Sequence, residues 1–104
     1  MVEFDLESDL RFQGSLKDSG LDAELEVLVA IDTIAAQGLS WNDFERIHGW
    51  DPLSIVGPGT YPEAVELYAF ALVGESGQRY QVIASSINHT VVVCAVARRF
   101  KPQP

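Results

Sequence analysis

The sequence contains a single cysteine, Cys94, in 104 residues. A lone thiol cannot form a disulfide within the chain, and it is typical of proteins from a reducing cytoplasm. The chain also has no apolar run near the roughly 18 residues that a membrane-spanning helix needs. Its first residues carry acids where a secretory signal would carry bases and an apolar segment. We therefore expect a cytoplasmic protein without a signal peptide or a membrane anchor.

Motifs for catalysis and for metal binding are equally scarce. His48 and His89 are the only histidines, and no Cys-x-x-Cys or His-x-x-x-His pair occurs. The chain has no Gly-x-Ser-x-Gly segment, and Gly57-Pro58-Gly59 lacks the remaining residues of a phosphate-binding loop. We therefore expect neither a metal nor a cofactor, and the sequence favours a protein that is not an enzyme.

Acids outnumber bases, and the two kinds of charge are unevenly placed. The chain has 15 acids and 7 bases, which gives a net charge of −8 and a pI near 4.5. Residues 1–51 hold 12 of the acids and 3 of the bases, so this half has a net charge of −9, whereas the second half has +1. Such an acidic chain disfavours nucleic acid as a partner and favours a basic protein.

The length and the 47% hydrophobic content predict one folded domain over residues 1–104. Near the N-terminus, Val2, Phe4 and Leu6 alternate with acids, which predicts a short strand. Residues 8–20 are rich in serine, glycine and aspartate, so we expect a loop there.

Two helices are predicted next. The first covers residues 21–37, with Asp18 or Ser19 as its cap, and it has apolar residues at helical spacing that would face the core: Leu21, Leu25, Leu28 and Ile31, widened by Val27 and Ile34. The second covers about residues 41–48, with Ser40 as its N-cap and Asp43 at the third position of a capping box. Gly38 and Gly49 are expected to end the two helices.

The rest of the chain predicts a loop followed by a meander. Residues 49–63 are rich in glycine and proline and are predicted as a loop. Three antiparallel strands are expected over residues 65–73, 79–85 and 90–100, with a frayed tail at 101–104. The sequence therefore predicts an α+β fold: an N-terminal strand, two helices and a three-stranded antiparallel meander, with the helices on one face of the sheet.

The last predicted strand is apolar on both faces. Such a strand lies inside a sheet, or its outer face is covered by a helix or by a second subunit. The last of these options predicts self-association, most simply as a two-fold homodimer through the C-terminal sheet.

The charge pattern favours a small interaction module, such as an inhibitor or immunity-type protein, that binds a basic partner through an acidic surface. The acids expected on that surface are Glu3, Asp5, Glu7, Asp22, Glu24, Asp43 and Glu45. Trp41 or Trp50 would supply an apolar anchor. A weaker alternative is a small-ligand pocket beneath residues 49–63.

Residues 76–104 contain four bases and no acid. These bases either pair with the acids of the first half or form a site of their own. The element order, together with segments 77–83 and 90–99, resembles the RelE/ParE superfamily of bacterial toxins, including its BrnT branch. In ribosome-dependent members, strand-borne Arg, Lys and Tyr act on RNA, so the resemblance implies a ribonuclease toxin, or a degenerate relative, that uses Arg79, Tyr80, Arg98 and Arg99. Those toxins are basic, whereas this chain is acidic.

Overall fold

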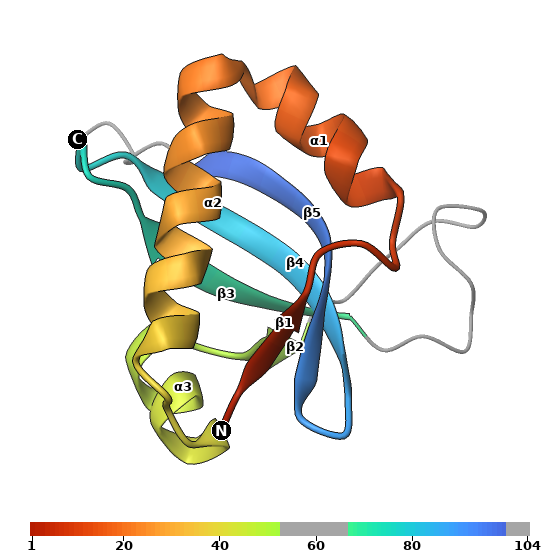
Figure 1. Cartoon of the computed structure of the whole chain (residues 1–104), viewed down its shortest axis with the longest axis vertical. Helices are drawn as coiled ribbons and strands as arrows, with labels where there is room; N and C mark the ends of the chain where they lie inside the picture. The colour runs from red at the N-terminus through yellow and green to blue at the C-terminus, as the bar shows by residue number, and fades with distance from the viewer. Residues whose placement is uncertain (53–66, 100–104) are drawn as a thin grey trace.

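A computed structural model describes residues 1–52 and 67–99, which form one mixed sheet with helices against one face (Figure 1). This arrangement confirms the predicted α+β class. The elements in chain order are β1 (Glu3–Asp5), α1 (Arg11–Ser19), α2 (Leu21–Ala36), α3 (Trp41–His48), β2 (Asp51–Pro52), β3 (Tyr68–Val73), β4 (Arg79–Ile87) and β5 (Thr90–Arg99).

The sheet is larger than predicted. Its strand order in the described chain is β1-β5-β4-β3-β2, and β3, β4 and β5 form the expected antiparallel meander. β1 pairs with β5 in parallel, with Glu3 opposite Thr90, and β2 pairs with β3. The prediction of an N-terminal strand and a three-stranded meander therefore missed one strand, β2, which is only two residues long and contains a proline. The rest of the predicted 49–63 loop, the pocket beneath it and the 101–104 tail lie outside the described residues.

Residues 11–19 form α1, so the prediction of a loop over residues 8–20 was wrong. Phe12 and Leu16, one helical turn apart, are both buried in the core. Ser15 is also used: its Oγ donates to the carbonyl of Phe12 at 2.9 Å and accepts from the main-chain N–H of Val96 at 3.1 Å. Packing on β5 therefore overrides the weak helix propensity of a segment that contains glycine and serine.

Only part of the apolar stripe predicted on α2 faces the core. Leu21 and Leu25 were expected inside, but they are 71% and 56% exposed. The buried residues of α2 are Ala23, Val27, Ile31 and Ile34. Apolar residues surround most of this helix, so spacing alone is consistent with more than one buried stripe.

The helix caps were predicted with mixed success. Neither Asp18 nor Ser19 caps α2: its N-cap is Gly20, at φ 93°, with no side-chain cap hydrogen bond. A positive φ suits glycine, which lets α1 and α2 meet at a single connecting residue. The cap of α3 is confirmed, because Ser40 Oγ accepts from the N–H of Asp43 at 3.2 Å.

A β-bulge in β5 explains its apolar residues on both faces. Ala84 pairs with Val93 and Ile83 pairs with Ala95, which leaves Cys94 as the extra residue. The bulge reverses the alternation, so Val93 and Val96 both belong to the core although an odd number of positions separates them. The sequence pattern therefore needs no second subunit to explain it.

Candidate protein-interaction surface

Glu26 links α2 to the β3–β4 turn. Its Oε2 accepts a hydrogen bond from Tyr80 Oη at 2.6 Å, and its Oε1 accepts from the main-chain N–H of Ser76 at 2.8 Å. Gly74 lies directly beneath this carboxylate: a Cβ added there would lie 2.7 Å from Glu26 Oε2. A glycine at position 74 therefore allows the close approach that fixes α2 beside the end of β3.

A groove of about 530 Å³ lies between α2, the end of α3 and β3. We call it the α2–β3 groove. Apolar side chains from all three elements contribute to its walls, including Val29, Ile34, Ile47, Leu72 and Val73. Its polar lining comes from Glu26, Thr33, Gln37, His48 and Glu75.

His48 lies where α3 meets β3. Burial lowers the pKa of its imidazole, and a hydrogen bond to the main chain of Ala71 partly opposes that effect. The ring is therefore neutral at neutral pH. Its Nε2 is buried and has no hydrogen-bond partner among the described residues, so it remains an unused acceptor or donor beside the groove.

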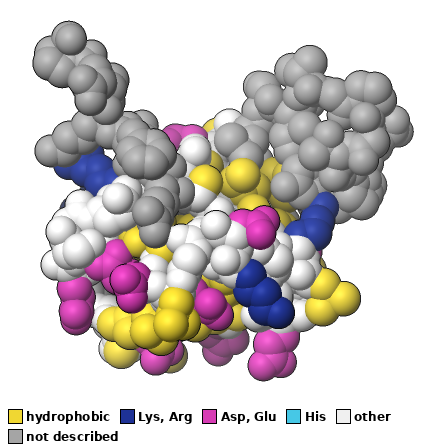
Figure 2. Space-filling view, turned by 90° about the horizontal axis from the view of Figure 1, so that it is seen from above, with side chains coloured by type: hydrophobic (Ala, Val, Ile, Leu, Met, Phe, Trp, Pro, Cys, Tyr) yellow, Lys and Arg dark blue, Asp and Glu magenta, His cyan; other side chains and the backbone are white. Residues whose placement is uncertain are grey.

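A row of exposed apolar side chains runs along α2 toward the groove. Leu21, Leu25 and Val29 are four residues apart and so lie on one side of the helix; Val29, 49% exposed, also lines the groove. We call these three residues the outer row. Two further exposed apolar residues line the groove from the other elements: Ile47 of α3, which is 51% exposed, and Val73 of β3, which is 62% exposed. Figure 2 shows hydrophobic side chains gathered at the lower edge of the view, with acidic side chains beside them.

Acidic side chains that pair with no described residue lie beside this apolar surface. Asp22, Asp32 and Glu75 are exposed, and none takes part in an ion pair within the described chain. We call these three residues the acidic rim. The two ion pairs found in the described residues are local: Arg11 with Asp9, and Arg46 with Asp43 at 3.3 Å.

Sequence reasoning missed most of this surface. Of its residues, only Asp22 was among the acids expected to bind a partner. The sequence of α2 does indicate the outer row, because this helix has more apolar residues than one buried stripe can accommodate. Glu24, the other predicted acid of α2, is half-buried and lies on a different side of the helix from the outer row.

The acids predicted near the N-terminus lie elsewhere. β1 is separated from β3 in the sheet by β5 and β4, so Glu3 and Glu7 are exposed on a different part of the molecule. Asp5 has a structural role: it accepts from Ser8 Oγ at 2.5 Å and from the N–H groups of Glu7 and Ser8. These bonds, that from the Ser8 hydroxyl first, lower the pKa of the Asp5 carboxyl.

Both tryptophans have internal partners. Trp41 stacks on His89 at 5.1 Å between ring centroids, and its Nε1 donates to Glu45 Oε1 at 2.5 Å. Trp50 stacks on Tyr68 at 4.9 Å and contacts Trp41 edge-on. Both rings are half-buried. The two tryptophans therefore consolidate α3 against β3 and the β4–β5 turn. Asp43 and Glu45 make their contacts within α3, with Arg46 and with Trp41.

Arg79 and Tyr80, predicted as members of one site, point to opposite faces of the sheet. Arg79 is exposed, whereas Tyr80 is 1% exposed and its hydroxyl is bonded to Glu26. In the register, Arg99 is opposite Arg79 and Arg98 is opposite Tyr80. Arg79 and Tyr80, at least, therefore do not line one face of the sheet. Arg79 makes no ion pair with any described residue, so pairing with the N-terminal acids is not seen there.

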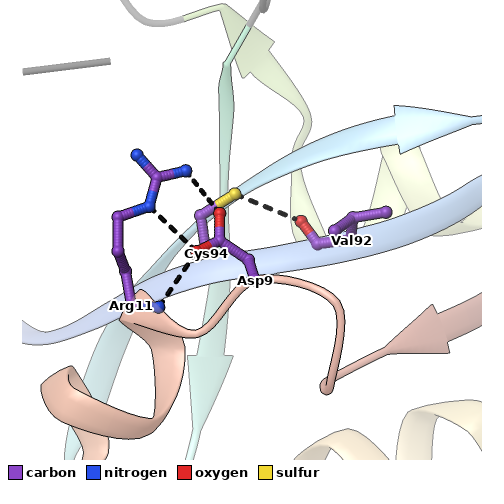
Figure 3. A network of polar contacts seen from close by, with 4 residues as sticks. All are labelled: Asp9, Arg11, Val92 and Cys94. Carbon is purple, nitrogen blue, oxygen red and sulfur yellow. Dashed lines mark hydrogen bonds and ion pairs between the residues drawn. The ribbon is translucent and has the colours of Figure 1, made fainter. Parts of the chain in front are cut away.

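Cys94 lies in a small polar network at the start of α1 (Figure 3). Arg11 holds Asp9 through its Nε, at 2.9 Å, and through Nη2, and this contact keeps the pKa of the Asp9 carboxyl well below its usual range. Burial, together with the nearby Asp9, raises the pKa of the Cys94 thiol to about 11. The thiol is therefore protonated at neutral pH and is a poor nucleophile.

A metal site and a membrane-spanning helix are both absent from the described residues. No group of three or more His, Cys, Asp or Glu side chains is placed to hold a metal ion there. None of the described helices has the length and hydropathy to cross a membrane. Comparisons with protein-family models, with curated proteins and with solved structures found no match.

Proposed function

We propose that this chain is a small, non-enzymatic interaction module that binds a basic protein, in the manner of an inhibitor or immunity-type protein. The observation that carries the proposal is the acidic rim: exposed carboxylates that form no ion pair with any described residue and that border an exposed apolar row on α2. Complementary charge speeds association and sets partner choice, while apolar contacts at the centre of an interface supply most of the affinity.

The alternatives have less support. The ribonuclease toxin hypothesis needs Tyr80 at a surface, and this residue is buried. A homodimer through the C-terminal sheet was predicted from two-sided burial of β5, and the bulge accounts for that pattern without a partner. Measurement of the mass by sedimentation at several concentrations tests the homodimer.

The test of the proposal is affinity capture from a lysate of the native host, at low and at high salt. The informative variant neutralises the acidic rim through Asp22→Asn, Asp32→Asn and Glu75→Gln. A matched control neutralises three exposed acids outside the rim through Glu3→Gln, Glu7→Gln and Asp51→Asn. Both variants change the net charge by +3, so they differ only in where the charge is removed.

We expect the wild type and the control to capture the same basic protein in a salt-sensitive manner, and the rim variant to lose it. The complex is then rebuilt from the two purified proteins, and its affinity is measured against ionic strength. Equal capture by the rim variant, or an affinity that salt does not change, would contradict the proposal. Capture of RNA or ribosomes in place of a protein would favour the toxin hypothesis instead.

A further inference from the structure

We infer that the α2–β3 groove receives a short segment of the basic partner in which an apolar side chain lies next to Lys or Arg. The inference rests on the proposed function, and it adds where the partner makes contact and what chemistry that segment has.

The groove offers apolar walls at a size that suits side chains. Its volume of about 530 Å³ lies within the range of pockets that bury small organic groups. Val29, Ile47 and Val73 stand at its walls and are each about half exposed. A leucine-sized side chain, or the aliphatic stem of a lysine or arginine, would cover them.

The polar groups of the groove are mostly acceptors. Glu75 contributes an exposed carboxylate, and Glu26 contributes negative charge although its oxygens already accept from Tyr80 and Ser76. Thr33 donates its hydroxyl proton to the carbonyl of Val29 at 2.8 Å, which leaves the oxygen lone pairs. Among the described lining side chains, no Lys or Arg is present. An acceptor-rich groove on an acidic chain favours an occupant that brings donors and positive charge, and disfavours anionic groups.

A second copy of this chain is a poor occupant for the same reason. It would bring Asp22, Glu26 and Glu75 against an equally acidic surface, and like charges across an interface are unfavourable. Addition of a partner strand to β3 is also restricted. The main chain of Ala69 is paired with β2, and that of Ala71 is hydrogen-bonded by His48. Side chains are therefore expected to provide the main anchor.

The test uses ¹⁵N-labelled full-length protein titrated with defined tetrapeptides. The probe is Ac-Leu-Arg-Leu-Lys-NH₂, and the comparison peptides are Ac-Leu-Glu-Leu-Glu-NH₂ and Ac-Gly-Arg-Gly-Lys-NH₂. We expect the first to give saturable shifts in the amides of Val29, Thr33 and Val73. The acidic peptide is expected to give none, and the glycine peptide only weak, non-saturating shifts.

Two arginine variants on α2 locate the contact. Thr33→Arg places a cation in the groove, whereas Ala36→Arg places the same cation on the exposed side of the helix, outside the groove lining. We expect Thr33→Arg to weaken the Leu-Arg-Leu-Lys peptide at least about tenfold and Ala36→Arg to change it by less than about threefold. Val73→Arg, on the opposite wall, should repeat the loss if Thr33→Arg disturbs folding.

Several results would overturn the inference. One is that the acidic peptide binds as tightly as the Leu-Arg-Leu-Lys probe, and another is that the probe shifts only the amides of Leu21 and Leu25. A third is that the probe gives no saturable shifts up to its solubility limit. The last is a set of amide shifts that depend on protein concentration without any peptide, which would indicate a second copy of the chain. The captured host protein separates the two claims. If the rim variant loses that protein while Thr33→Arg retains it in full, the proposed function stands and the groove inference fails; if both variants retain it, both fail.

Discussion

Replacement of Tyr80 by phenylalanine is expected to destabilise the fold by about 2 kcal/mol. The hydroxyl of this buried residue donates to Glu26 Oε2 at 2.6 Å, and hydrogen bonds to charged groups contribute about 1.5–3 kcal/mol. Phenylalanine fills the same space, so no cavity adds to the loss. The value lies toward the lower end of the range because Glu26 is half-buried and keeps its bond from Ser76.

Urea unfolding followed by circular dichroism measures this change. The midpoint should fall while the slope with urea stays constant, because the surface exposed on unfolding is unchanged. For a chain of this size, 2 kcal/mol corresponds to a drop of roughly 8–16 °C in the melting temperature.

A double-mutant cycle assigns the loss to the named contact. Glu26→Gln alone should also destabilise, and the double variant with Tyr80→Phe should be less destabilised than the sum by about 1–2 kcal/mol. Glu24→Gln, on the same helix and with no side-chain bond to the described residues, is the matched control and should stay within about 0.5 kcal/mol of the wild type. A loss below about 0.5 kcal/mol for Tyr80→Phe, or full additivity in the cycle, would refute the reasoning.

Three further results are expected. Asp9→Asn should destabilise the fold at pH 7, and its difference from the wild type in urea unfolding should narrow progressively as the pH falls below about 4. Below that pH the unfolded chain binds a proton at Asp9 that the native state still resists, so the stabilisation is lost gradually. A pH-independent difference would contradict this. The free energy of unfolding of the wild type should fall relative to that of His48→Gln as the pH drops below about 6.5. Below that pH His48 binds a proton in the unfolded chain, whereas burial opposes its protonation in the folded protein. Equal pH profiles of the two proteins would contradict this prediction. Cys94, with a pKa of about 11, should react slowly with iodoacetamide at pH 8 in the folded protein and rapidly in urea, as followed by mass spectrometry; equal rates would show an accessible thiolate.

The parts of the fold that the sequence predicted correctly are those determined by neighbouring residues. The cap at Ser40 and the glycine-containing turn between β3 and β4 leave local signals, and both were found. Helix α1 was missed because its stability comes from packing on β5, far along the chain. Likewise, no residue near β1 indicates that its partner is the parallel strand β5.

The candidate site was less predictable, because it depends on which side of α2 is buried. The acidic character of the surface followed from composition. The outer row did not, since Leu25 and Val27 are equally apolar and only the tertiary structure shows that Val27 faces the core. The tryptophans were chosen for their size, and their stacking partners His89 and Tyr68 lie far away in the sequence.

The parallel pairing of β1 with β5 determines when this protein can fold during synthesis. Phe4 pairs with Val91 in the sheet, and the hydroxyl of Ser15 accepts a hydrogen bond from the main-chain N–H of Val96. Both partners lie near the far end of the described chain. The first strand and helix therefore leave the ribosome long before their partners exist. Until β5 emerges, Phe12 and Leu16 remain solvent-exposed apolar groups of the nascent chain, which makes this stretch a natural binding segment for chaperones.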